Sequence, residues 1–257
     1  MSFPNFLDKF NKKTFASAKS FWKYKKEIGR IPEINPPNGI IICYSTRLFN
    51  YIINNHNVRK VDYVFGDYFY ILEEDNKQLG ICGGFGIGAP MVAILLEELT
   101  AFGVKYFISI GTAGSLQENL KLGSIAICDK AIRDEGVSHH YLKSEKYTHA
   151  SEEVINKLTE VIKKLGLDYK IGTGWTIDAP YRETYAEIEK YRKENVLTVN
   201  MEAAAIFTVA NYLNVNAGVL FTISDYLCEE KWELHFHLTE KYLQNLFLIA
   251  KKTIFSL

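Results

Sequence analysis

The chain has 257 residues, of which 47% are hydrophobic and 23% charged, and its 30 basic residues balance its 30 acidic residues. This composition is typical of a globular protein with a sizeable buried core. A net charge of zero excludes the basic surface that binds nucleic acids or anionic membranes, so we expect neither kind of partner. No apolar run has the length of a membrane span, and the basic N-terminus lacks the apolar core of a signal peptide. The sequence therefore predicts a cytoplasmic protein.

Residues 1–35 are expected to form a helical N-terminal extension, and residues 36–257 a single α/β domain, because no repeat or linker interrupts them. The extension is rich in lysine and predicts an amphipathic helix. Phe6, Phe10 and Phe21 are its candidates for burial.

The cysteines and the C-terminal histidines lack the spacing of a metal site. Cys43, Cys82 and Cys128 lie in apolar runs, which favours buried free thiols, and Cys228 has no nearby cysteine. His235 and His237 alternate with apolar residues and have no companion ligands. We therefore predict no metal site.

Short apolar runs alternate along the chain with segments of helical periodicity. The expected strands are 39–43, 61–65, 68–72, 78–82, 104–110, 124–132, 169–175 and 217–223. The expected helices are 46–55, 89–102, 151–165, 182–193, 201–213 and 239–255. This alternation predicts a three-layer α/β/α domain with a mixed but mostly parallel central sheet.

Three polar or glycine-rich segments follow expected strands: the loop 83–88, the loop 111–114 and Ser224-Asp225. Ligands of such sheets bind at the carboxyl ends of the strands, so we expect these segments to meet. The loop 83–88 matches the dinucleotide fingerprint poorly, because no acidic residue follows at the required distance. It is either a tight turn or a loop whose backbone N–H groups approach an anion or a sugar.

The same segments resemble the purine nucleoside and uridine phosphorylases of the nucleoside phosphorylase superfamily. The matching strings are 86–90, 97–99, 107–114, 133–136, 199–205 and 222–225, in the family's order. The resemblance implies the phosphorylase fold and cleavage of a nucleoside at C1′ by inorganic phosphate, with no other cofactor. It also implies a homo-oligomer, either a dimer or a trimer of dimers.

The resemblance assigns the sugar to the motif Asn200-Met201-Glu202. Glu202 would accept a hydrogen bond from the ribose 2′-hydroxyl, and Met201 would pack on the sugar. Asn200 stands where the family usually has a second Glu, and its amide would bond a sugar hydroxyl without the charge. In the alternative interpretation, Glu202 caps the following helix.

The base is assigned to Asp225, Ser224 and the segment around Tyr181. A protonated Asp225 would donate to N7 of a purine, which requires a raised pKa. Pro180, Tyr181 and Trp175 would contact the base, and Arg182 would meet phosphate or base carbonyls. The alternatives are a capping role for Ser224-Asp225 and core packing for the aromatic side chains.

The phosphate is assigned to Arg47, Gly86, Thr112 and Ser109. Ser109 stands where the family has a second arginine, and Gly66 stands near the place of a third, with Arg59 close by. His139-His140 would reach the ribose 5′-hydroxyl or lie exposed in a loop.

Four functions stay open at this point. The leading hypothesis is a purine nucleoside phosphorylase, in which Asp225, Glu202 and Arg47 are catalytic. A uridine phosphorylase is its close variant. A hydrolytic nucleosidase is favoured by Ser109, and a non-catalytic nucleoside-binding or storage protein is permitted by Asn200.

Overall fold

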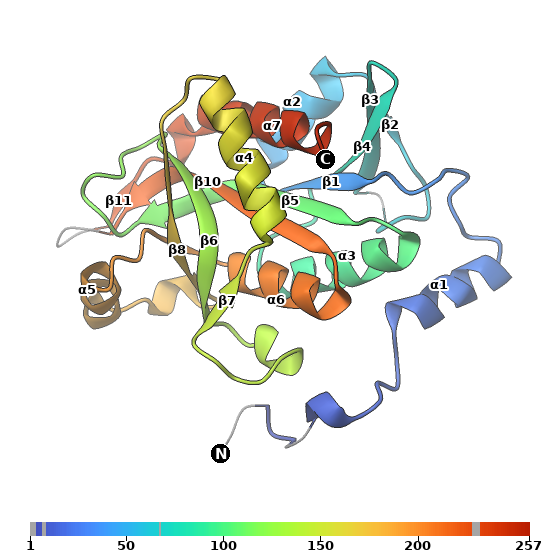
Figure 1. Ribbon diagram of the computed structural model, residues 1–257, viewed down its shortest axis with the longest axis horizontal. Helices are drawn as coiled ribbons and strands as arrows, with labels where there is room; N and C mark the ends of the chain where they lie inside the picture. The colour runs from blue at the N-terminus through green and yellow to red at the C-terminus, as the bar shows by residue number, and fades with distance from the viewer. Residues whose placement is uncertain (1–3, 7–8, 67, 228–231) are drawn as a thin grey trace.

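The structure is a computed structural model that describes residues 4–6, 9–66, 68–227 and 232–257 (Figure 1). Its strands are β1 (Gly39–Cys43), β2 (Val58–Lys60), β3 (Phe69–Glu74), β4 (Lys77–Gly83), β5 (Tyr106–Ser115), β6 (Ile125–Asp134), β7 (Tyr147–His149), β8 (Tyr169–Ile177), β9 (Thr198–Asn200), β10 (Asn216–Tyr226) and β11 (Glu233–Leu234). Its α-helices are α1 (Ala18–Glu27), α2 (Thr46–Asn55), α3 (Ala89–Phe102), α4 (Glu152–Lys164), α5 (Tyr185–Lys193), α6 (Ala203–Leu213) and α7 (Glu240–Ile254). Short 3₁₀ turns are η1 (Lys9–Asn11), η2 (Ser138–His140), η3 (Pro180–Arg182) and η4 (Phe236–Leu238).

The expected three-layer architecture is confirmed. Figure 1 shows α2, α4 and α7 on one side of the sheet and α3 and α6 on the other. Strand β1 explains why a continuous apolar run fits between two layers. Ile40 and Ile42 pack into the core beneath α3 and α6, whereas Ile41 and Cys43 pack into the core beneath α2, α4 and α7.

The sheet is mixed, and its longest ladders are parallel. β5 pairs in parallel with β10 and β1, and β6 pairs in parallel with β8. Antiparallel pairing joins β2, β3 and β4 at one edge, and it joins β10 to β6 and β9 to β5. Because β5 pairs with both β9 and β10, the strands β10, β6, β8, β9 and β5 close into a ring.

Several expected bounds are confirmed, including the helices 46–55 and 89–102, whereas others differ, among them the following three segments. The expected strand 61–65 is wrong, because Tyr63 and Phe65 have positive φ angles, which no strand accommodates. Residues 111–114 are not a loop but the end of β5, and Ser224-Asp225 lie inside β10. Both strands run further because they hydrogen-bond to each other along this stretch.

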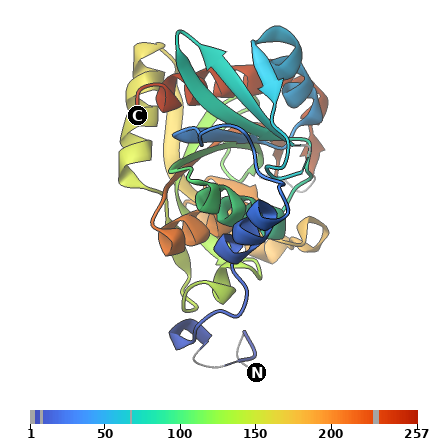
Figure 2. The same ribbon diagram turned by 90° about the vertical axis from the view of Figure 1, so that its right-hand side faces the viewer.

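The N-terminal segment packs on the outside of α3 through one side chain that the sequence did not single out. Trp22 of α1 stacks on Phe102 with ring centroids 5.0 Å apart, and its indole N–H donates to the Glu98 carbonyl oxygen over 2.7 Å. Figures 1 and 2 show α1 against α3. The expected burial of Phe6 and Phe21 is wrong, because both are largely exposed, and Phe10 is only half-buried.

None of the described helices is long and apolar enough to cross a membrane. The described cysteines, Cys43, Cys82 and Cys128, are buried free thiols, as expected, and Cys228 lies outside the described residues.

Candidate active site

A cavity of about 350 Å³, the main cavity, lies beside the carboxyl ends of β5 and β10. Its lining comes from segments far apart in the sequence, namely Tyr44, Ile87, residues 112–114, Pro180, Tyr181, Glu183, residues 199–202, Ser224, Asp225, Trp232 and Phe236. The ring of strands brings these segments to one place. The main cavity therefore gathers most of the residues assigned to the sugar and the base, together with Thr112 from the phosphate set.

Glu202 is one of two buried carboxyl groups in the main cavity, together with Asp225. Its Oε1 atom accepts a 2.7 Å hydrogen bond from the backbone N–H of Gly88, at the start of α3. Gly88 has a φ of 102°, a conformation that favours glycine. Burial raises the pKa of Glu202 to about 7, and the charge of Asp178 acts in the same direction against hydrogen bonds from the backbone of Gly88 and Met201.

These contacts bear on the two interpretations of Glu202, as a ligand of the sugar or as a cap of the following helix. Glu202 occupies the N-cap position of α6, but its side chain makes no capping hydrogen bond there. The carboxylate instead joins the glycine-rich loop to the main cavity. Because Glu202 takes the N–H of Gly88, that N–H is not available to an anion.

Asn200 performs the capping that was considered for Glu202. Its Oδ1 atom accepts hydrogen bonds from the backbone N–H groups of Glu202 and Ala203 and from the Thr176 hydroxyl, over 2.9 to 3.1 Å. Its Nδ2 atom donates to the Trp175 carbonyl oxygen over 3.1 Å. The amide oxygen is therefore occupied by the start of α6, and only one N–H of the amide is left for a ligand.

A β-bulge brings Ser224 and Asp225 to the main cavity together. The register between β10 and β5 shifts between Ile223 and Asp225, so Asp225 rather than Ser224 lies opposite Gly114. In a regular strand these two neighbours would point to opposite faces, and a bulge changes the direction of side chains in this way. The Ser224 hydroxyl donates to Asp225 Oδ1 over 2.6 Å.

The position opposite Asp225 requires glycine. A Cβ atom on Gly114 would lie 3.0 Å from Asp225 Oδ2 and would collide with Leu227. Gly114 thus leaves room for the carboxyl group of Asp225 on the neighbouring strand β10. Gly114 therefore has a packing role, which the expectation of a loop over residues 111–114 did not indicate.

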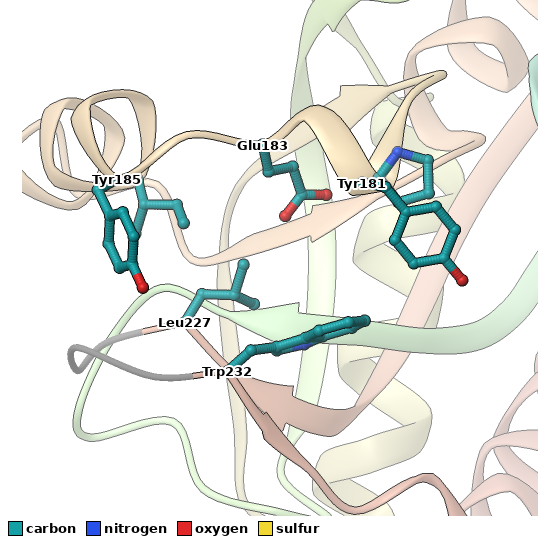
Figure 3. Close-up of a pocket in the computed structure, with 7 residues that line it drawn as sticks. Tyr181, Glu183, Tyr185, Leu227 and Trp232 are labelled. Carbon is teal, nitrogen blue, oxygen red and sulfur yellow. The ribbon is translucent and has the colours of Figure 1, made fainter.

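Tyr181, Glu183 and Trp232 line both the main cavity and a neighbouring cavity, and Figure 3 shows the latter. The rings of Tyr181 and Trp232 have centroids 6.4 Å apart and an edge-to-face orientation. The indole N–H of Trp232 donates to Asp225 Oδ2 over 2.7 Å. Tyr181 is 86% exposed, so its ring is free to cover a flat ligand.

The base contact expected of Trp175 is wrong. Its side chain is fully buried in a separate core with Tyr191 and Leu227, and its indole N–H donates to Asp134 Oδ2. Trp175 lies on β8 in the register that faces this core, so the core-packing alternative applies to it. Pro180, by contrast, does line the main cavity.

The expected phosphate set is only partly brought together. Thr112 lines the main cavity, whereas Arg47 is exposed on the first turn of α2 and, like Gly86, is not among the lining residues. Ser109 is buried, and its hydroxyl is hydrogen-bonded to the Tyr44 hydroxyl over 2.9 Å. Ser109 of β5, where the resemblance implies an arginine, thus forms a pair of hydroxyl groups with Tyr44, which follows β1.

The remaining candidates lie away from the main cavity. Gly66 lines a different pocket, and Arg59 pairs with Glu73 on the sheet edge. His139 bonds to the Arg133 carbonyl oxygen and His140 to Lys9 Nζ, so both histidines contact protein groups. In the ranges that the structure describes, no group of three or more His, Cys, Asp or Glu side chains is arranged to hold a metal ion.

Four lining residues lie outside the segments that were assigned from the sequence: Tyr44, Glu183, Trp232 and Phe236. Tyr44 follows a predicted strand directly, and Glu183 is next to the expected base segment, so position along the chain offered a signal for both. Trp232 offered none, because only the return of the chain through β11 brings it back to Asp225.

Comparisons with known proteins agree with this arrangement. The family model of the phosphorylase superfamily matches residues 46–253. A uridine phosphorylase from Thermococcus kodakarensis is 34% identical over 139 residues, which cover 49% of this chain and 50% of that protein. A purine nucleoside phosphorylase from Plasmodium vivax is 31% identical over 179 residues, which cover 67% and 72%. The chain thus aligns with about half of the length of the first of these relatives.

Solved structures share the fold. The uridine phosphorylase of Vibrio fischeri matches with a TM-score of 0.71 at 23% identity, covering 86% of this chain and 91% of that one. The Plasmodium knowlesi homologue of the Plasmodium falciparum purine nucleoside phosphorylase matches with a TM-score of 0.71 at 25% identity, covering 86% and 90%. Together with the family match over most of its length, these likenesses show that the chain belongs to the phosphorylase superfamily.

Proposed function

We propose that the chain is a nucleoside phosphorylase that cleaves the N-glycosidic bond of a purine nucleoside, with inorganic phosphate as co-substrate. The products are the free base and ribose 1-phosphate. The observation that carries this proposal is the presence of the buried Glu202 and the Asp225–Glu183 pair in the main cavity. Membership of the phosphorylase superfamily supports it.

Cleavage at C1′ passes through a state in which the sugar resembles a cation. Glu202 in its ionised form accepts a hydrogen bond from a ribose hydroxyl and stabilises the positive charge that develops on the ring. Met201 packs on the apolar face of the sugar. Tyr181 and Pro180 cover the base, and Asp225 and Ser224 contact its edge.

A carboxyl group beside the base favours purines. When the bond to C1′ breaks, a purine gains negative charge that protonation at N7 neutralises, and a carboxylic acid supplies such a proton. Burial raises the pKa of Asp225, and burial together with the charge of Asp225 raises the pKa of Glu183 to about 7. Glu183 therefore keeps its proton in a substantial fraction of molecules at neutral pH.

Phosphate would be held by Thr112, Ser109 and the backbone near Gly86, with Arg47 as its cation. Arg47 is exposed on α2, next to the segment that carries Tyr44. It would have to turn toward the main cavity when phosphate binds.

A hydrolytic nucleosidase is the second candidate, and one observation favours it. The Tyr44 hydroxyl is bonded to the buried Ser109 hydroxyl, and the described residues that line this wall of the main cavity include no lysine or arginine. Such a wall suits water better than a phosphate dianion.

A panel of nucleosides with and without phosphate distinguishes these functions. We expect purine nucleosides to be cleaved only when phosphate is present, with ribose 1-phosphate as product. Free ribose as the sole product in saturating phosphate would show a nucleosidase. Faster cleavage of uridine than of purine nucleosides would show a uridine phosphorylase. Tight binding of nucleosides without cleavage would show a binding or storage protein.

We also propose a cytoplasmic homo-oligomer, either a dimer or a trimer of dimers. Exposed apolar side chains at Tyr63, Tyr68, Ile87 and Ile94 give the region around the glycine-rich loop and α3 a surface that contact between copies would bury. The described free thiols are consistent with a reducing compartment. Light scattering of the purified chain would measure the oligomer.

A further inference from the structure

Glu183 is a carboxyl group in the main cavity that neither the resemblance nor the sequence pattern assigned. It follows η3 and lines both the main cavity and a neighbouring cavity of about 260 Å³. Figure 3 shows its carboxyl oxygens pointing into the space between Tyr181, Leu227 and Trp232. The described residues provide no hydrogen bond to this carboxyl group, although the side chain is half-buried.

Asp225 has the opposite environment. Its Oδ1 atom accepts a 2.6 Å hydrogen bond from the Ser224 hydroxyl, and its Oδ2 atom accepts a 2.7 Å hydrogen bond from the indole N–H of Trp232. An indole N–H can only donate, so Oδ2 must act as an acceptor. Two donors stabilise the ionised form of a carboxyl group. The geometry therefore makes Asp225 the better carboxylate of the two.

The charged groups around Glu183 favour its protonated form, whereas the donors around Asp225 favour the ionised form. Asp225 faces it from β10, and Glu187 faces it from α5, where it is held by the Thr184 hydroxyl in a capping box. His235, which follows β11, acts on Asp225 and lowers its pKa, and no cation among the described residues acts on Glu183 in this way. Tyr181 and Tyr185 contribute aromatic rings to the lining. Burial, Asp225 and Glu187 thus all favour the protonated form of Glu183.

We propose that Glu183, and not Asp225, is the acid that protonates the departing base. This inference rests on the proposed function. As the C1′–N9 bond breaks, its electron pair moves to the purine, and the proton of the Glu183 carboxyl group moves to N7. A phosphate oxygen forms the new bond to C1′. Glu183 is left as a carboxylate and takes a proton back from solvent, while the phosphate releases its own proton. Asp225 stays ionised and holds Trp232 and Ser224 in position.

Glu183→Gln tests the proposal when two kinds of substrate are compared. The first is the purine nucleoside that the wild-type protein cleaves fastest. The second is 7-methylguanosine, whose base is already cationic and leaves without receiving a proton. We expect Glu183→Gln to lower kcat/KM for the first by about a hundredfold to ten-thousandfold. For 7-methylguanosine we expect a change of less than about threefold, because no proton transfer is lost.

The pH profile is the second readout, and it is independent of 7-methylguanosine. We expect kcat/KM of the wild-type protein for the purine nucleoside to have a bell-shaped pH profile, because ionisation of Glu202 raises it on the acid side and loss of the Glu183 proton makes it fall on the alkaline side of about pH 7. This fall should be absent in Glu183→Gln and retained in Asp225→Asn. Glu189→Gln is the matched control, because Glu189 is an exposed side chain of α5, the helix that follows Glu183, and pairs with Lys193, and it should behave like the wild-type protein.

The outcomes separate this proposal from the proposed function. Suppose that the wild-type protein cleaves nucleosides but that Glu183→Gln lowers kcat/KM equally for both substrates, or that its kcat/KM still falls with rising pH. The assignment of Glu183 is then overturned, while the proposed phosphorylase function is unaffected. If Asp225→Asn removes the fall of kcat/KM with rising pH, Asp225 is the acid that protonates the base. If the wild-type protein cleaves no nucleoside, both proposals are wrong.

Discussion

The sugar side and the phosphate side of the main cavity are built in different ways. On the sugar side, Glu202 is bonded to the backbone of Gly88, and Asn200 is bonded to Thr176 and to the start of α6. On the phosphate side, the polar groups are the Tyr44–Ser109 pair and Thr112, and Arg47 is exposed. The sugar side is thus organised before any ligand binds, whereas the charge that phosphate requires must be brought in by movement.

This difference matters for catalysis, because groups that are fixed in advance stabilise a developing charge without reorganisation. Under the proposed function, transition-state stabilisation would come from the sugar side. Binding of the nucleophile would depend on the phosphate side, which has fewer charges and more freedom. The following variants test how far the two sides are independent.

Glu202→Gln should have the largest effect on activity. We expect kcat/KM for the preferred nucleoside to fall by about a hundredfold to a thousandfold, because a neutral amide does not stabilise the sugar cation. Gln retains an oxygen that can accept from Gly88, so the fold should persist. Steady-state kinetics with a melting curve would measure both, and near-normal turnover would show that the sugar side is not catalytic.

The same variant should be more stable than the wild-type protein at alkaline pH. The pKa of Glu202 is raised from 4.5 to about 7 in the folded protein, so the folded state binds the proton more tightly than the unfolded state. The wild-type protein therefore loses stability as the pH rises from about 4.5 to about 7, by on the order of 2–3 kcal/mol. Denaturant titrations at pH 5 and pH 8 should show a gain for Glu202→Gln only at pH 8. An equal difference at both values would contradict the buried charge.

Arg47→Ala tests the phosphate side. We expect the KM for phosphate to rise about tenfold to a hundredfold, since one charge-assisted contact contributes about 1.5–3 kcal/mol. Nucleoside binding without phosphate and thermal stability should hardly change, because Arg47 is exposed. Arg59→Ala is the matched control on the sheet edge. A similar loss in both variants would indicate a general charge effect instead of a phosphate contact.

Asn200→Ala should mainly reduce stability, which separates it from Glu202. Loss of a helix cap costs about 0.5–2 kcal/mol, and the Thr176 hydroxyl loses a buried partner as well. Asn200→Asp can still accept the same three hydrogen bonds but lacks the N–H that donates to the Trp175 carbonyl oxygen, so it should recover only part of the loss in denaturant titrations. If Asn200→Ala is as stable as the wild-type protein but binds nucleoside poorly, the amide is a sugar ligand after all.

Tyr44→Phe should have the smallest effect. It removes one hydroxyl from the wall and leaves Ser109 with an unpaired hydroxyl, which costs about 0.5–1.5 kcal/mol of stability. The phenyl ring can still pack against Phe85. If phosphate uses the hydroxyl pair, its KM should rise by less than in Arg47→Ala. A lower KM for phosphate in Tyr44→Phe would show that Tyr44 competes with the anion for this place.

The amino-acid sequence by itself determined the layers of the fold and much of the site. Apolar runs such as 39–43 read as strands covered on both sides, and α2 and α3 have the bounds that their periodicity and caps predict. These signals are local, since they depend on the spacing of side chains and on residues such as Ser45 and Gly103 at helix ends. Glu202, Met201 and Asp225 were found because motifs in the family's order carry them.

The tertiary structure alone decided which neighbours these residues have. The bulge beside Ile223, the ring closed by β5 and the return of Trp232 to Asp225 all arise from pairing between distant segments. Those contacts decided that Asn200 caps α6, that Trp175 belongs to a core, and that Glu183 is a carboxyl group without a donor beside one with two. Periodicity reports only whether a side chain faces inward. The hydrogen-bond partner and the charge that it meets there depend on how the strands are arranged in space.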